Sequence, residues 1–170
     1  MSPSFKYGLT TGAGCCLWIL AEFALGFHTT RPDIGEYSGY FSGVIPLVTL
    51  TLLLRQCRAA APDGTLTLRQ GLRAGFQASL VAALVVYGFL LVYHQFINPA
   101  GVDLALEWKV AQLRAQGVTE SAVREEIVSY RQMNSPLGLV TGTLVGLPLL
   151  GGAFSVPITL VLRRGSAPRP

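Results

Sequence analysis

The chain has 170 residues, of which 51% are hydrophobic and 13% are charged, with a mean hydropathy of +0.47. An average soluble domain carries about 25% charged residues, so this composition excludes an ordinary soluble domain and equally a disordered chain. The formal net charge of +4 could suggest a nucleic-acid partner, but the basic residues flank apolar runs rather than form a patch. The sequence therefore predicts a membrane protein whose partner is the lipid bilayer, with no nucleic acid.

Four apolar runs are long enough to cross a bilayer as helices. A spanning helix needs about 20 mainly apolar residues, and it satisfies its own backbone hydrogen bonds, which lipid cannot do. The runs cover residues 8–27, 37–54, 74–97 and 137–162. We therefore expect an all-α membrane protein, a single domain over residues 1–170 with four transmembrane helices.

A long polar segment, residues 98–136, separates the third run from the fourth. It is too long for a plain connection, and it holds two apolar stripes at helical spacing on either side of Gly117. The stripes are Val102, Leu106, Val110 and Leu113, then Val123, Ile127 and Tyr130. The pattern predicts an outer loop of two amphipathic helices that lies on the outer leaflet, caps the bundle or binds a partner. We expect residues 163–170 to form a disordered tail.

The basic residues are divided unequally between the two predicted sides of the membrane. One side carries Lys6, Arg55, Arg58, Arg69, Arg73, Arg163, Arg164 and Arg169. The other side carries fewer basic residues, and these are mixed with acidic ones. Cytoplasmic segments carry an excess of Lys and Arg. The sequence therefore predicts a multi-pass protein of the bacterial inner membrane with both termini in the cytoplasm and the long loop in the periplasm.

Glycines recur at a spacing of four in every predicted span. Such spacing lets two membrane helices approach closely, so we expect these residues to pack the bundle, or to join it to a second copy or to other membrane subunits. They are Gly8, Gly12, Gly39, Gly43, Gly71, Gly75, Gly138, Gly142 and Gly146.

Three prolines also lie within the predicted spans. Each removes a backbone donor and crowds the preceding turn, so each should kink its helix. They are Pro46, Pro148 and Pro157.

Glu22 is the only Asp, Glu, Lys or Arg residue inside a predicted span. A charge at this depth is costly and often functional, although a structural hydrogen bond, or a carboxylate that reaches the outer interface, would also explain it. Tyr87 lies at a similar depth, His28 ends the first span, and His94 and Gln95 end the third. The two histidines could meet near Glu22, but so small a set predicts no metal site.

Four stretches resemble a known family. They are Lys6-Tyr7-Gly8-Leu9, Leu68-Arg69-Gln70-Gly71-Leu72-Arg73-Ala74-Gly75, Tyr93-His94-Gln95-Phe96-Ile97-Asn98-Pro99 and Asn134-Ser135-Pro136-Leu137-Gly138. Over nearly the whole chain they resemble the bacterial membrane family catalogued as domain of unknown function 4199. The resemblance implies four transmembrane helices in a bacterial inner membrane, and it carries over no activity and no catalytic residue.

The sequence holds no familiar signature of catalysis. It has no nucleophile motif, no Gly-rich phosphate loop and no paired catalytic carboxylates, so we expect no enzyme and no cofactor. An outer-face activity of Glu22, His28 and His94 is a remote alternative. The leading hypothesis is a non-enzymatic structural or accessory protein that acts through helix association, and the second is a small transporter or channel that uses Glu22 as an ion or proton site.

Overall fold

The computed structural model describes residues 1–164, and every regular element within that range is helical. The elements are α1 (Pro3–Ala24), α2 (Pro32–Phe41), α3 (Val44–Ala59), α4 (Leu68–Val92), η1 (Tyr93–Ile97), α5 (Gly101–Ala115), α6 (Glu120–Met133), α7 (Pro136–Leu139), η2 (Val140–Gly146) and α8 (Leu147–Arg164). The segments η1 and η2 are π-helical: η1 ends the α4 helix, and η2 joins α7 to α8.

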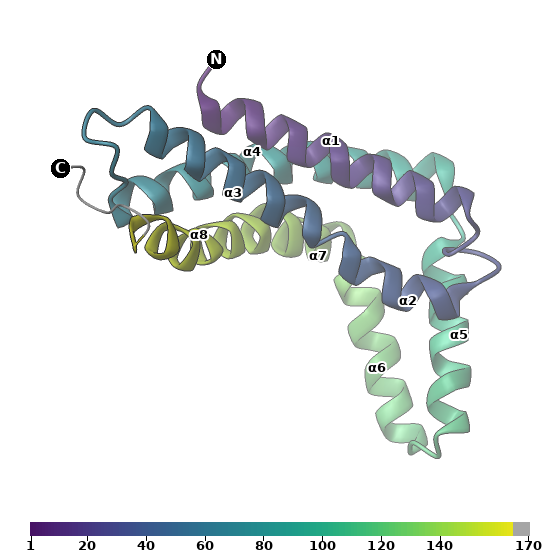
Figure 1. Ribbon diagram of the computed structural model, residues 1–170. Coiled ribbons are helices and arrows are strands. Elements are labelled where there is room, and N and C mark those ends of the chain that lie inside the picture. Colours follow the sequence, from purple (N-terminus) through teal and green to yellow (C-terminus); the bar gives the residue numbers. More distant parts are fainter. Residues whose placement is uncertain (165–170) are drawn as a thin grey trace.

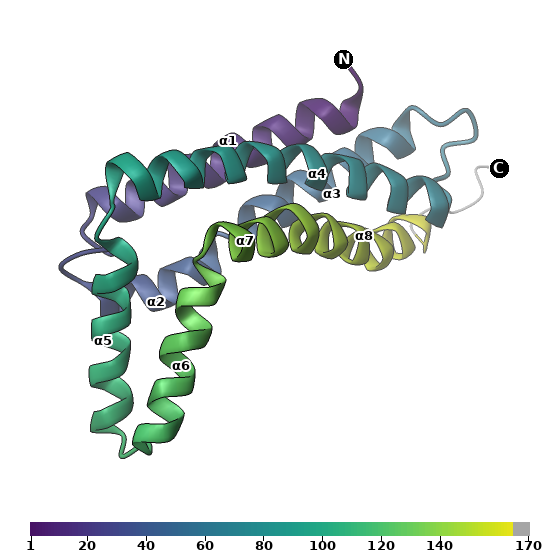
Figure 2. The ribbon, with the colours of Figure 1, turned by 180° about the vertical axis from the view of Figure 1, so that it is seen from behind.

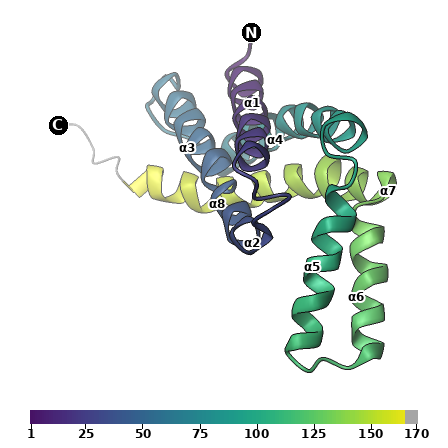
Figure 3. The same ribbon diagram turned by 90° about the vertical axis from the view of Figure 1, so that its right-hand side faces the viewer.

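The helices α1, α3, α4 and α8 form a bundle, and α5 and α6 project from one end of it (Figure 1). Helix α4 packs against α1 and against α8, so it is the central helix of the bundle (Figure 2). Figure 3 shows α5 and α6 side by side, running crosswise to α8. The start of α1, the α3–α4 connection and the end of α8 all lie at the end of the bundle away from α5 and α6 (Figure 1).

The outer surface of the bundle is apolar. Leu53, Leu54 and Ala83 are completely buried, whereas Leu84, Phe154 and many other large apolar side chains are more than half exposed. A soluble monomer rarely exposes contiguous apolar surface on this scale, whereas lipid chains would cover it. The surface fits a protein embedded in a bilayer.

Within residues 1–164, three helical segments are long and apolar enough to cross a membrane, namely Pro32–Ala59, Leu68–Ile97 and Pro136–Arg163. The prediction of a multi-pass helical membrane protein is therefore confirmed in outline. Helix α1 is not among the three segments, since polar residues interrupt its apolar sequence. It packs along α4 all the same, and its role as a fourth span stays a prediction.

The helices do not begin and end where the predicted apolar runs do, because capping groups, and not hydropathy, set the helix ends. Helix α4 begins at Leu68 rather than at residue 74, because Thr67 and Gln70 form a reciprocal capping box. Helix α1 begins at Pro3, where the Ser2 hydroxyl accepts a bond from the Phe5 N–H, and it ends at Ala24. Helix α8 continues to Arg164, so residues 163 and 164 are not part of a tail, and residues 165–170 lie outside the described part.

The predicted packing glycines fall into two groups. Gly8 and Gly12 lie against α4, and Gly71 and Gly75 lie against α8. A Cβ atom on Gly75 would be 2.7 Å from Ser155 Cβ, so only glycine permits this approach. A Cβ atom added at the other predicted glycines would not meet another long helix: it would find nothing within 4 Å at Gly39 and Gly142, and only the backbone of nearby turns at Gly43, Gly138 and Gly146.

Two of the three predicted proline kinks coincide with helix irregularities. The helix is interrupted at Ser42 and Gly43, where Pro46 has no N–H to offer the carbonyl four residues back. Pro148 follows the π-helical segment η2 at the start of α8. Helix α8 continues through Pro157 without interruption.

Candidate functional site

Glu22 is buried near the end of α1, where its carboxylate accepts two hydrogen bonds and lies beside a histidine. Its side chain lies one turn beyond Trp18, whose Nε1 donates to Oε1 at 2.8 Å. The Ser38 hydroxyl on α2 donates to the same oxygen at 2.6 Å. His28 Nε2 lies 3.4 Å from Oε2. The residue is only 5% exposed, and these donors supply the partners that a buried charge requires.

His28 connects this carboxylate to the end of the α4 helix. Its Nδ1 lies 2.6 Å from the Tyr93 hydroxyl, which also accepts a bond from Asn98 Nδ2 at 3.2 Å. The roles in the His28–Tyr93 bond depend on the imidazole tautomer: with the proton on Nε2, which faces Glu22, Nδ1 accepts the Tyr93 proton. Every group in this chain then has a suitable partner.

The π-helical turn η1 makes the bond between Tyr93 and Asn98 possible. A π-helical turn closes bonds between residues five apart, and the Asn98 N–H donates to the Tyr93 carbonyl at 2.8 Å. Residues 93 and 98 therefore lie close together, which they would not do in a regular α-helix. Gly101 completes the arrangement, because a Cβ at that position would overlap the Asn98 side chain.

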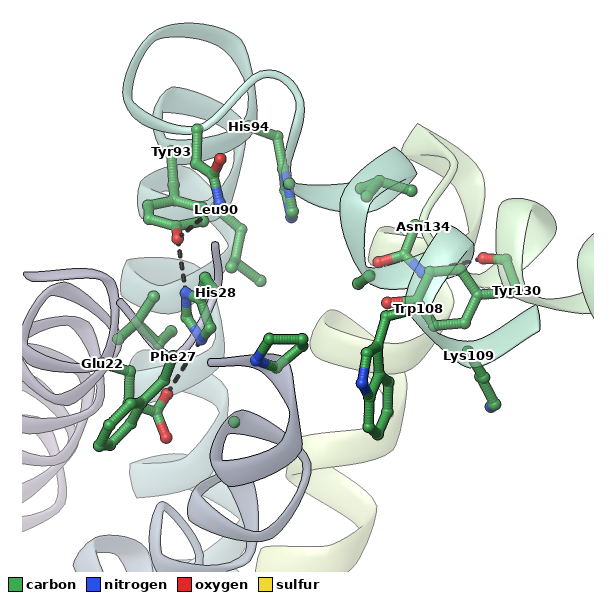
Figure 4. Close-up of a pocket in the computed structure, with 17 residues that line it drawn as sticks. Glu22, Phe27, His28, Leu90, Tyr93, His94, Trp108, Lys109, Tyr130 and Asn134 are labelled. Carbon is green, nitrogen blue, oxygen red and sulfur yellow. Dashed lines mark hydrogen bonds and ion pairs between the residues drawn. The ribbon is translucent and has the colours of Figure 1, made fainter. Parts of the chain in front are cut away.

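A cavity of about 410 Å³ opens beside this network. Its walls come from α1, α2, the end of α4, η1, α5 and α6, so it lies where the projecting helices meet the bundle. Figure 4 shows Glu22, His28 and Tyr93 on one side and Trp108, Tyr130 and Asn134 on the other. Ile19, Phe27, Leu90, Val102 and Ala105 supply apolar surface between them.

The wall formed by α5 and α6 is held together by polar contacts. Lys109 pairs with Glu126 at 2.5 Å and lies 5.5 Å from the centre of the Tyr130 ring. Asn134 Nδ2 donates to the Tyr130 carbonyl at 2.8 Å. Burial raises the pKa of Tyr130, and the neighbouring Lys109 ammonium opposes that rise. The hydroxyl of Tyr130 therefore keeps its proton near neutral pH.

The two predicted amphipathic stripes pack mainly against each other. Leu106 and Val123 are buried, and the other members of both stripes are at least partly buried. Gly117, with a φ of 75°, provides the reversal between α5 and α6, which a residue with a side chain rarely allows. The members of both stripes are thus mostly covered in the fold, whereas Leu104 and Val128 on the same helices stay exposed.

Three of the predicted polar residues come together in the structure. Glu22, His28 and His94 all line the cavity. Gln95 is exposed, and Tyr87 makes no hydrogen bond to Glu22 in the described residues. No three His, Cys, Asp or Glu side chains within residues 1–164 lie close enough to hold a metal ion.

Sequence reasoning did not name Trp18 or Ser38 as partners of Glu22, nor Trp108 and Lys109 as part of the site. Trp18 could have been found, because residues four apart share one face of a helix. The others belong to elements whose meeting depends on the tertiary fold.

A comparison with models of protein families identifies the family of this chain. The family model described as a protein of unknown function, DUF4199, matches residues 6–164. The chain belongs to the DUF4199 family. No curated protein and no solved structure matches it. All residues that line the cavity fall within the DUF4199 match.

Proposed function

We propose that this DUF4199 protein is a multi-pass membrane protein that binds a small amphiphilic molecule in the cavity beside Glu22. One observation carries the proposal: a cavity of about 410 Å³ joins the Glu22–His28–Tyr93 network to an apolar wall. Ligand sites typically have volumes of about 300–1,000 Å³ and combine apolar walls with a few polar groups.

In this proposal α1 is a fourth span and the cavity faces the outside of a bacterial inner membrane. The start of α1, the α3–α4 connection and the end of α8 lie together at the opposite end (Figure 1), which is the end richer in basic residues. Tyr37, Tyr40 and Phe96, near the cavity end, are each more than half exposed. Aromatic side chains favour the membrane–water interface, so they support a site at interfacial depth.

Binding accounts for the geometry better than transport. A transport path would have to continue past Glu22 into the bundle. A void inside the bundle, around Thr11 and Thr49, measures about 10 Å³, which is room for about one water molecule. The hydroxyls of Thr11 and Thr49 are themselves hydrogen-bonded at 2.7 Å. The proposed function is therefore non-enzymatic binding, without passage of a solute.

A second candidate function is helix association, in a homo-oligomer or with other membrane subunits. Gly39 and Gly142 favour it, because a Cβ at either position would meet nothing within 4 Å, so their backbones are open to a partner helix. Mass measurement in mild detergent tests this function. A monomer at every concentration, with no second protein bound, would exclude it.

Native mass spectrometry of the full chain, released from membranes in mild detergent, tests the binding function. Ala105 on α5 lines the cavity, and Ala105→Trp should fill it. Ala111 is an exposed residue of the same helix outside the cavity, so Ala111→Trp is the matched control. We expect a bound amphiphile on the wild type and on Ala111→Trp, and its loss from Ala105→Trp. Equal occupancy of the two variants would reject the cavity as the site.

A further inference from the structure

Several polar side chains that line the cavity still have N–H groups free to donate, and we propose that the amphiphile it binds carries an anionic head group. This inference rests on the proposed function, and it adds the charge of the ligand. It follows from which polar groups already have partners and which do not.

The one carboxylate in the cavity is already satisfied. Glu22 Oε1 accepts bonds from Trp18 and Ser38, and Oε2 lies 3.4 Å from His28 Nε2. Two hydrogen bonds and the neighbouring His28 ring, around a carboxylate at 5% exposure, leave little capacity for a cationic ligand. Glu22 therefore orders one wall of the cavity and is a poor partner for an ammonium group.

Three other polar side chains of the cavity can still donate, whereas the side-chain oxygens of Asn98 and Asn134 can only accept. Within the described residues the Trp108 indole N–H, which can only donate, has no acceptor, and Figure 4 shows its nitrogen on the side that faces Glu22 and His28. The Lys109 ammonium has three N–H groups and pairs with Glu126 through one contact. His94 Nδ1 is buried and has no partner in the described part of the chain.

These donors belong to opposite walls of the same cavity, with apolar side chains between them. An anionic head group could accept bonds from Trp108, Lys109 and His94, while Phe27 and Leu90 contact the first carbons of its chain. A phosphate or a carboxylate meets this requirement equally well, because both offer several acceptor oxygens. The inferred ligand class is thus an amphiphile with an oxyanion head group.

Calorimetric titration of the full chain in phosphatidylcholine nanodiscs tests the inference. The probes are dodecyl phosphate, dodecyltrimethylammonium and inorganic phosphate, which separate the charge of the head group from the contribution of the chain. We expect dodecyl phosphate to bind about tenfold or more tightly than either other probe, since charge-assisted hydrogen bonds are the strong ones.

Two variants isolate the positive charge. Lys109→Gln and Glu126→Gln both break the same ion pair, but only the first removes the cation. Lys109→Gln should weaken dodecyl phosphate binding about tenfold, whereas Glu126→Gln should keep or improve it. Equal losses in both variants would show that the pair acts only by holding α5 to α6, and would overturn the role of Lys109.

The outcomes separate this inference from the proposed function. Binding of dodecyltrimethylammonium that Ala105→Trp abolishes, with weaker binding of the phosphate, keeps the cavity as a ligand site and overturns the anionic head group. Inorganic phosphate binding as tightly as dodecyl phosphate would support the anion and overturn its amphiphilic nature. If no probe shows binding that depends on residue 105, both proposals fail.

Discussion

The Nδ1 atom of His28 lies 2.6 Å from the hydroxyl oxygen of Tyr93. This contact joins the segment after α1 to the turn that ends the α4 helix, across 65 positions of sequence. It also connects Glu22 to Asn98, because His28 lies beside the Glu22 carboxylate and Asn98 donates to Tyr93. The wall of the cavity is thereby tied to two neighbouring helices of the bundle.

The first prediction concerns the energy of this contact. Tyr93→Phe and His28→Ala should each destabilise the protein, and the double variant should lose less than the sum of the single losses. The coupling should be about 1 kcal/mol, the usual net value of a protein hydrogen bond. Unfolding by sodium dodecyl sulfate from mixed micelles measures the cycle. Additive losses would show that the two side chains act independently.

The second prediction concerns the charge on Glu22. In Glu22→Gln, an amide NH₂ group, which donates hydrogen bonds, replaces one carboxylate oxygen, which accepts them. Donors then face donors around a buried side chain. The free energy of unfolding should fall by about 2 kcal/mol, within the range for hydrogen bonds to charged groups. Glu107→Gln, at an exposed acid on α5, should change it by less than about 0.5 kcal/mol. Matching effects at the two positions would contradict the role given to the network.

The third prediction concerns the approach of α4 to α8. Gly75→Ala would bring a Cβ atom to 2.7 Å from Ser155 Cβ and 2.9 Å from the Gly151 carbonyl oxygen. Neither atom is the free end of a flexible side chain, so overpacking should cost about 1–3 kcal/mol. A Cβ atom added at Gly88, on the same helix, would have nothing within 4 Å. Gly88→Ala should therefore be neutral or stabilise the helix by up to about 1 kcal/mol. Thermal unfolding in detergent compares the two, and a stable Gly75→Ala variant would refute the packing.

The fourth prediction concerns the reversal between α5 and α6, outside the spans. Arg114 donates two bonds to Glu120, at 2.9 and 3.2 Å, and these hold the pKa of the Glu120 carboxyl below its ordinary 4.5. Since the pKa is lowered by folding, the pair stabilises the folded state above the ordinary pKa, and this contribution is lost as the pH falls through the lowered value.

Arg114→Gln should raise the pKa of Glu120 back toward 4.5, as measured by the carbon-13 chemical shift of the carboxyl group. Arg124 acts on the same carboxyl more weakly, so Arg124→Gln should shift the pKa less. An unchanged titration in Arg114→Gln would show that the two side chains do not pair in solution.

Much of the fold could be predicted from the sequence, because long apolar runs leave helices as the only structure that satisfies the backbone in lipid. The ends of the helices could not be predicted in the same way, because the caps formed by Thr67 and Gln70 extend α4 beyond its apolar run. The interruption at Ser42 and Gly43 was also not expected there, although Pro46 had indicated a kink in that segment.

The candidate site could be predicted only in part. Glu22, His28 and His94 stand out as polar residues near span ends, and the structure places all three on one cavity. The bond from Asn98 to Tyr93 depends on a π-helical turn, which the regular helical period does not contain. The wall containing Trp108 depends on where α5 is placed at the end of the bundle, which no local pattern specifies.

Photo-crosslinking tests the central claim, a ligand site beside Glu22, most directly. The probe is an amphiphile with a diazirine next to its head group, added to the full chain in native membranes, and the labelled peptides are mapped by mass spectrometry. The account predicts labels at Phe27, Val102 and Ala105, which line the cavity, and competition by unlabelled amphiphile. Labels confined to lipid-facing residues such as Leu84 and Phe154, without competition, would contradict it.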